Sequence, residues 1–152
     1  MANTDTPMGL VPIRHKSGAP YNGAVNPYYV PSTYATALFV GDPVVKTGTA
    51  NTAGVKRIGG NFAIGALPEV NKATAGATNR ISGVVVGFMP ENNESLTYGA
   101  ASTERIALVA DDPDLVFEAQ GDDALAVTGI GANANLVFTH SGHDHGQVRG
   151  RG

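Results

Sequence analysis

The chain has 152 residues, a formal net charge of -3, only 15% charged residues and no cysteine. This length fits one ordinary domain, and the negative charge argues against nucleic acid as the main partner. The absence of cysteine excludes disulfides, thiolate zinc sites and a cysteine nucleophile. The N-terminus lacks the basic start and apolar core of a signal peptide, and no run of roughly 18 apolar residues could span a membrane. We therefore expect a soluble, unexported protein with no membrane partner.

Residues 1–31 contain five of the nine prolines. Each proline removes a backbone donor and biases the residue before it away from the helical region, so this segment is predicted to be an extended N-terminal arm. Two interpretations remain open: the arm packs its tyrosines on its own domain, or it lies across a neighbouring subunit. In the second case its contact residues would be Leu10, Val11, Tyr21, Tyr28 and Tyr29.

Residues 32–139 carry short apolar bursts separated by Gly, Pro, Asn or Asp, and many of the apolar residues are β-branched. This pattern predicts a mainly β domain, either a small β-barrel or a β-sandwich. The segments GTANTAGV and NKATAGATNR are predicted to be hairpin loops, and Asp122 could cap a short helix through DDALAV. The residues expected to contribute to the core are Val44, Val84, Val86, Ile106, Leu108, Phe117, Leu136 and Phe138.

Three aspartates stand in the four positions Asp111 to Asp114, between two apolar runs. Because Pro113 presets a turn dihedral and Asp suits the position before it, we predict a turn that joins a strand over 105–110 to one over 115–119. The sequence does not match a calcium loop of the EF-hand type, because that loop needs a glycine at its sixth position and this segment has none there. An alternative function is a carbohydrate-active β domain, either a glycoside hydrolase or a sugar-binding module, that uses Asp112 with Glu104 or Glu118.

The last segment, residues 140–152, reads HSGHDHGQVRGRG. Its glycines and lack of apolar anchors predict a flexible tail that binds metal weakly at most, so neither a structural metal site nor a cofactor is expected. The chain has no nucleotide-binding pattern and no nucleophile elbow, so we predict that it is not an enzyme. Acidic residues are concentrated over residues 91–123, where they form either a solvated face or a surface for a basic partner.

Four phrases, in this order, resemble a known family: GLVPIRHKSGAPYNGAVNPYYVPSTYATALFVGDPVV, GVVVGFMP, ADDPDLVFEAQ and GANANLVF. From about Gly9 to Phe138 the chain is similar to head decoration, or cement, proteins of tailed bacteriophages. The resemblance implies a non-catalytic virion protein, made in the host cytoplasm, that binds the capsid exterior and stabilises it by bridging coat subunits. Its implied partners are the major capsid protein and further copies of itself, first of all as a trimer. Members of that family continue through further strands after NANLVF, so the resemblance leaves closure of a barrel open.

Overall fold

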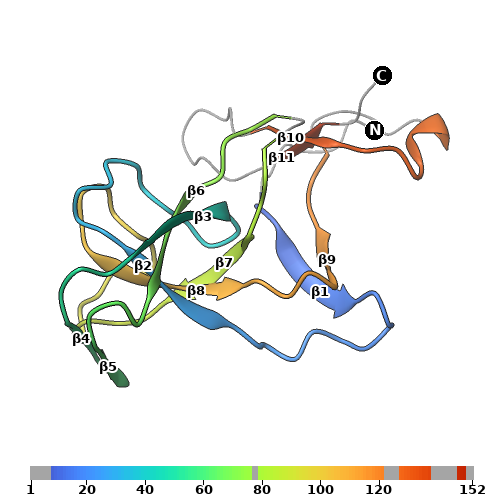
Figure 1. The fold of residues 1–152 in the computed structure, drawn as a ribbon. Helices are drawn as coiled ribbons and strands as arrows, with labels where there is room; N and C mark the ends of the chain where they lie inside the picture. Colours follow the sequence, from blue (N-terminus) through green and yellow to red (C-terminus); the bar gives the residue numbers. More distant parts are fainter. Residues whose placement is uncertain (1–7, 77–78, 122–126, 138–146, 150–152) are drawn as a thin grey trace.

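The computed structural model describes residues 8–76, 79–121, 127–137 and 147–149, and its described part is mainly β, as predicted (Figure 1). Of the two predicted architectures, the barrel is the one that forms. Its five strands lie in the order β2 (Asn26–Val30), β6 (Pro68–Lys72), β3 (Pro43–Ala50), β7 (Gly83–Phe88) and β8 (Arg105–Ala110). The barrel therefore closes without any strand that follows β8.

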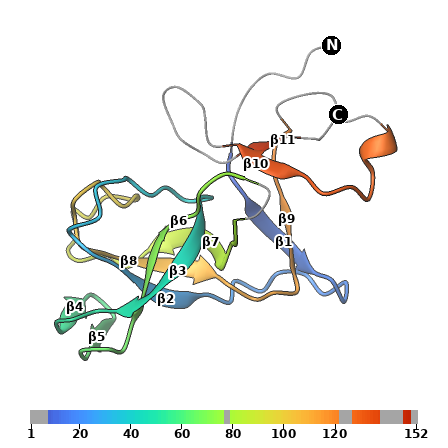
Figure 2. The same ribbon diagram turned by 45° about the horizontal axis from the view of Figure 1, so that its top comes forward.

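Three two-stranded sheets accompany the barrel, as Figures 1 and 2 show. They pair β1 (Val11–His15) with β9 (Leu115–Glu118), β4 (Val55–Arg57) with β5 (Gly60–Phe62), and β10 (Asn135–Val137) with β11 (Gln147–Arg149). A single turn of 3-10 helix, η1 (Val127–Gly129), precedes β10. We call the β1–β9 pair the ribbon and the β4–β5 pair the hairpin.

The barrel is closed by its first and last strands. β2 pairs with β8 antiparallel over its whole length, from Asn26 opposite Val109 to Val30 opposite Arg105. On its other side β2 meets β6 in one parallel pair, Tyr29 with Glu69. All other neighbours in the barrel are antiparallel. Closure leaves the barrel without a sheet edge, which removes the usual site of unwanted strand pairing.

The inside of the barrel is filled by one apolar cluster to which every barrel strand contributes. Its eight residues are each at most 4% exposed. They are Tyr28, Val30, Leu38, Val44, Val70, Val85, Ala107 and Val109. Residues of one parity along a strand face one side of a sheet, so Tyr28 and Val30 point inward while Tyr29 points outward.

A second cluster lies outside the barrel wall, under the hairpin. Tyr29 and Ile106, from the outer faces of β2 and β8, pack there with Val55 and Leu67. Phe62 and Met89 cover the cluster from its edge. Because of this second layer, β8 is buried on both faces.

A buried ion pair joins the loop before β3 to β6. The carboxylate of Asp42 is fully buried, and its Oδ2 lies 3.3 Å from Nζ of Lys72. The same oxygen accepts the backbone N–H of Phe39 at 2.8 Å. Buried charges of this kind are tolerated when they are paired and hydrogen-bonded.

The predicted arm is corrected by the structure over residues 11–30. β1 pairs with β9 of the same chain, and β2 is a barrel strand, so a boundary at residue 31 does not separate an arm from the domain. Tyr28 and Tyr29 are 4% and 9% exposed inside their own domain, which makes them unavailable to another subunit. Residues 1–7 lie outside the described part of the chain.

The predicted core is right for some residues and wrong for others. Val44, Val84 and Ile106 are buried. Four others are only half-buried: Val86, Leu108, Phe117 and Leu136. Phe138 lies outside the described residues. In β7 and β8 the buried positions include Val85 and Val109 instead, because GVVVGF shows no alternation and its register against β8 shifts between Val85 and Gly87.

The two predicted hairpin loops also differ from the structure. The segment NKATAGATNR belongs to a crossover, because β3 lies between β6 and β7 in the barrel. The segment GTANTAGV is partly strand, since β3 continues to Ala50. The helix predicted through DDALAV covers residues 122–127, of which 122–126 lie outside the described part and Val127 begins η1. Within the part that is described, no helix is long and apolar enough to cross a membrane.

Candidate functional site

The segment from Asp111 to Asp114 forms the predicted turn between β8 and β9. The Asp114 N–H donates to Oδ1 of Asp112 at 2.8 Å, and the Leu115 N–H donates to the Asp112 carbonyl at 3.2 Å. The turn is also tied to the end of β1: His15 Nδ1 lies 3.4 Å from Asp112 Oδ2, and Lys16 Nζ lies 3.6 Å from Asp114 Oδ1. The acidic turn therefore meets the basic end of β1 within one chain.

Asp111 points the other way, toward the barrel. Its two carboxylate oxygens accept hydrogen bonds from Asn26 Nδ2 at 2.8 Å and from the Tyr28 hydroxyl at 2.5 Å. Burial and the bond to Asp111 raise the pKa of Tyr28, whose ring lies 5.2 Å from Nζ of Lys46. Asp111 thus joins the end of β8 to the start of β2.

Glu104 belongs to a separate network at the opposite end of β8. Its carboxylate accepts from Nη2 of Arg57 and from the Tyr29 hydroxyl, each at 2.9 Å. Burial, followed by this hydrogen bond, raises the pKa of Tyr29 to about 12. The Arg57 side chain is 3% exposed and lies 3.8 Å from Glu91 through Nη1. The network fastens the hairpin to the barrel.

The structure separates the carboxylates proposed for a glycosidase along the strands. Glu104 precedes β8 and Asp112 follows it, so about 20 Å of strand separates them at roughly 3.3 Å per residue. Asp112 lies beside His15, whereas Glu118 is opposite Val11 at the other end of the ribbon, roughly 10 Å farther along. Glycosidase carboxylates stand about 5 to 9.5 Å apart, so the separation along β8 argues against the pair of Asp112 with Glu104.

An apolar groove opens between the barrel and the ribbon. It has a volume of about 390 Å³, and its lining is mainly apolar. We define the groove by Leu10, Ile81, Val84, Leu115, Phe117 and Leu136. Asp111, Asp112 and Pro113 also line it and make it acidic on one side. A groove of this size falls within the range of ordinary ligand pockets, about 300–1,000 Å³.

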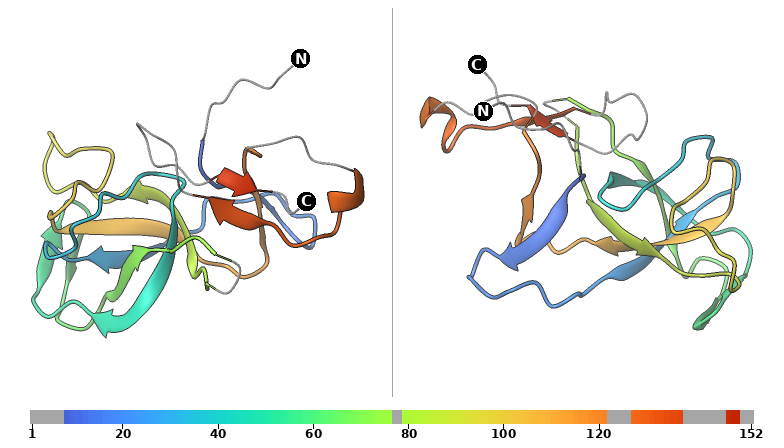
Figure 3. Two further views of the ribbon diagram at one scale, coloured as in Figure 1. Left: turned by 90° about the horizontal axis from the view of Figure 1, so that it is seen from above. Right: turned by 180° about the vertical axis from the view of Figure 1, so that it is seen from behind.

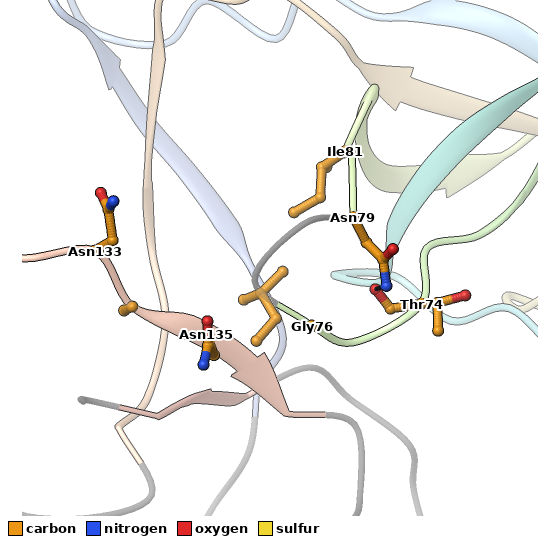
Figure 4. Close-up of a pocket in the computed structure, with 8 residues that line it drawn as sticks. Thr74, Gly76, Asn79, Ile81, Asn133 and Asn135 are labelled. Carbon is orange, nitrogen blue, oxygen red and sulfur yellow. Dashed lines mark hydrogen bonds between the residues drawn. The ribbon is translucent and has the colours of Figure 1, made fainter. Parts of the chain in front are cut away.

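A second, more polar hollow adjoins the groove at Ile81 and Leu136 (Figure 4). Its volume is about 300 Å³, and its labelled side chains include the carboxamides of Asn79, Asn133 and Asn135. The Asn79 amide is engaged by the carbonyls of Thr74 and Ala75, at 3.1 and 3.0 Å. Among the described residues that line this hollow, none is an acid, a base or a histidine.

The hairpin carries an exposed apolar tip, which we define as Ile58 and Gly59. Ile58 is 50% exposed, and its N–H donates to the Pro90 carbonyl at 3.1 Å. Gly59 adopts φ +98°, a conformation that favours glycine and allows the tight turn. The flanking Lys56 is exposed, while Arg57 anchors the tip through Glu104. The tip is thus an exposed apolar side chain on an anchored turn, flanked by the exposed Lys56 and by the Arg57–Glu91 pair.

A third apolar surface is the outer side of β1, which we call the β1 face. Val11 and Ile13 are 39% and 42% exposed. The register of β1 against β9 shifts between Pro12 and Arg14, so Ile13 stands at an irregularity of the pairing. The start of the strand is held against the barrel, because the Leu10 N–H donates to the Gly41 carbonyl at 2.9 Å. A Cβ added at Gly9 would lie 2.7 Å from Cα of Gly41, so two glycines are needed for this contact.

The other residues assigned to the predicted arm interface have mixed positions. Leu10 is half-buried and lines the groove, and Val11 belongs to the β1 face. Tyr21 folds back on its own ribbon, since its N–H donates to the Ile13 carbonyl at 3.1 Å and its hydroxyl to the Ala24 carbonyl at 3.0 Å. Burial raises the pKa of this phenol. Of the five residues, Leu10 lines the groove and Val11 is exposed, and their role at an interface stays a prediction.

The sequence analysis does not predict the exposed hairpin tip. The signal for it was the phrase KRIGG, in which a two-residue turn between short strands carries an isoleucine where polar residues are usual. The histidines of the C-terminal segment, His140, His143 and His145, lie outside the described residues. Within the described ranges, no group of three or more His, Asp or Glu side chains is placed to hold a metal ion.

Comparison of the chain with protein-family models, with curated proteins and with solved structures found no match in any of the three.

Proposed function

We propose that this chain is a structural protein of a tailed-phage virion that binds the outer surface of the capsid and stabilises it by bridging coat subunits. The motifs that resemble head decoration proteins suggest this function. The single structural observation that supports it is the β1 face, an exposed apolar strand surface held on a closed barrel.

The β1 face is suited to docking because it is ordered before any partner arrives. Val11 is paired with Glu118 of β9, the Ile13 carbonyl accepts the Tyr21 N–H, and the Gly9–Gly41 contact holds the start of β1. A surface that is already in its bound shape loses little conformational entropy on binding. Exposed apolar residues that lie together on a soluble protein mark interaction sites.

The mechanism follows from mass action. A protein that binds only the assembled shell shifts the equilibrium toward assembly, and each contact can be weak because the shell repeats it many times. In this proposal the protein is not an enzyme: Asp111, Asp112 and Glu104 serve as hydrogen-bond and ion-pair partners that join β2, β1 and the hairpin to the barrel. The separation of Asp112 from Glu104 along β8 favours this proposal over the carbohydrate-active alternative.

The proposal is tested by mixing the full-length protein with undecorated shells of the phage that encodes it. The double variant V11D/I13D places two charges on the β1 face and should weaken shell binding by roughly 10- to 100-fold, since burying an aliphatic side chain contributes roughly 1.5–3 kcal/mol. Co-sedimentation and the temperature at which shells break measure the effect. Deleting residues 1–31 is not a suitable test, because it removes the barrel strand β2.

Ile64→Asp is the matched control. Ile64 is 70% exposed but lies after β5, away from the ribbon. We expect this variant to bind and protect shells as the wild type does. If the wild-type protein leaves the sedimentation and heat resistance of the shells unchanged, the proposed function is wrong. If V11D/I13D binds as tightly as the wild type, the β1 face is not the docking surface.

A further inference from the structure

The hairpin tip and the apolar groove lie at opposite ends of the same pair of barrel strands. The tip contacts Pro90, just after β7, and its anchor Arg57 holds Glu104, just before β8. The groove is lined by Val84 at the start of β7 and by Asp111 just after β8. Six residues of strand span about 20 Å, so the tip and the groove lie roughly that far apart along β7 and β8.

The two surfaces are complementary in shape. The tip projects a single branched aliphatic side chain, that of Ile58, from a two-residue turn. The groove is concave, and its apolar lining includes Leu115 and Phe117. Anchor side chains that fill a pocket on a partner contribute most of the energy of a typical interface.

One exposed cation of the tip is free to meet the acidic side of the groove. Lys56 flanks the tip and is exposed, whereas Arg57 is paired with Glu91 and Glu104; Asp111 and Asp112 line one side of the groove. Each Asp111 oxygen accepts one hydrogen bond within the chain, and a carboxylate oxygen can accept more than one. Opposite charges at the rim of an interface favour correct orientation and faster association.

We propose that the hairpin tip of one copy inserts into the apolar groove of the next copy, so that the protein self-associates head to tail. The residues of this contact are different from those of the β1 face, which binds the shell in the proposed function. The inference rests on that function and adds how copies of the protein bind one another. A heterologous contact of this kind forms a ring when the rotation between copies closes. Such a ring presents several β1 faces together, which strengthens shell binding through multivalency.

The head-to-tail contact is tested without shells, by sedimentation of the full-length protein over a range of concentrations. Ile58→Glu should raise the dissociation constant of self-association by roughly 10- to 100-fold, because it replaces the buried aliphatic anchor by a charge. Ile81→Glu, on the 47% exposed groove residue Ile81, should do the same from the other side. Ile64→Glu is the matched control and should associate as the wild type does.

Mixing the two defective variants distinguishes head-to-tail from symmetric contacts. Ile58→Glu keeps an intact groove, and Ile81→Glu keeps an intact tip. An equimolar mixture should therefore form one-to-one heterodimers although each variant alone is monomeric. A symmetric contact of tip with tip, or of groove with groove, could not be restored in this way.

The outcomes separate the two proposals. If the wild-type protein stays monomeric in concentrated solution, the proposed self-association is wrong. This result does not affect the proposed shell binding, which is tested separately. Loss of association in Ile64→Glu, or no heterodimer in the mixture, overturns the assignment to the tip and groove. Circular dichroism and thermal unfolding of each variant, matched to the wild type, show that the effects do not come from unfolding.

Discussion

The barrel and the ribbon are both β structure, yet they differ in how far their apolar residues are exposed to solvent. The inner barrel cluster is at most 4% exposed, whereas Val11 and Ile13 on the ribbon are 39% and 42% exposed. The barrel closes on itself and has no edge, while the ribbon has only two strands and one face turned to solvent. The views in Figure 3 show the ribbon standing beside the barrel.

The difference shows which part stabilises the fold and which part is free to bind. A two-stranded sheet is marginal by itself, so the ribbon depends on the barrel for its order. Three contacts supply this order: the Gly9–Gly41 approach, the ion pairs around the Asp112 turn and the packing of Leu115. The sharpest tests of this division are substitutions that affect one region and spare the other.

The largest effect is expected in the barrel, from Asp42→Ala. This variant removes the carboxylate 3.3 Å from the Lys72 ammonium, which is only 10% exposed. Removing one partner of a buried ion pair costs about 3–5 kcal/mol of unfolding free energy. Urea unfolding followed by circular dichroism measures the loss. A change below about 1 kcal/mol would show that the pair does not stabilise the barrel.

A smaller effect is expected at the junction of the two regions, from Gly41→Ala. Gly41 adopts φ +93°, and an added Cβ would lie 2.9 Å from the Met8 carbonyl oxygen. We expect a loss of about 1–3 kcal/mol, the usual cost of backbone strain, together with faster amide exchange in β1. Hydrogen exchange should remain slow in β2 and β8. Equal acceleration in barrel and ribbon would contradict their division.

A pH-dependent effect is expected from Tyr29→Phe in the outer cluster. The pKa of Tyr29 is raised from 10 to about 12 in the folded state, so the folded protein retains the phenolic proton while the unfolded chain releases it. The stabilisation is complete below pH 10 and is lost as the pH rises through about 12. The wild type should therefore lose stability over this range more steeply than Tyr29→Phe. Denaturant unfolding at pH 9, 10 and 11 measures the two slopes; parallel slopes would contradict the prediction.

The smallest effect is expected from Asp112→Ala in the turn. Asp112 accepts one backbone N–H and faces His15 at a solvent-exposed position, where its side chain is 48% exposed. Exposed ion pairs contribute about 0–1 kcal/mol, so the unfolding free energy should fall by no more than about 1 kcal/mol. Thermal unfolding in calcium-containing and calcium-free buffer checks this value. Stabilisation by calcium that the substitution abolishes would restore the calcium-loop interpretation.

The sequence predicts the β class, the turn at Asp111 to Asp114 and several core residues, because those features depend on local patterns. It misses the placement of β2, because the prolines near Tyr28 and Tyr29 indicate an extended arm. Pro27 is tolerated because it stands near the start of its strand, as Pro43 does in β3. Val86 and Leu108 were misplaced because β7 and β8 lack clear alternation, and β8 is covered on both faces.

The candidate surfaces could be predicted only in part. Leu10 and Val11 were expected at an interface, and one lines the groove while the other is exposed. The groove itself brings together residues from 10 to 136 along the chain, which no local pattern indicates. The acidic stretch was interpreted as one face, but Glu104 and Asp112 stand at opposite ends of β8 and meet basic residues of their own chain.

The pairing of β2 with β8 also has a consequence for how the protein is made. Residues 26–30 pair with residues 105–109. During synthesis, β2 therefore cannot form this pairing until the ribosome has released the residues of β8. Long-range pairing of this kind delays the rate-limiting step of folding, because a large loop must close before any contact stabilises it. Until then, the tyrosines and valine of NPYYV are exposed on a nascent chain. Refolding from urea should accordingly be slow for a domain of this size, and crowding of the nascent chains should favour aggregation through this one segment.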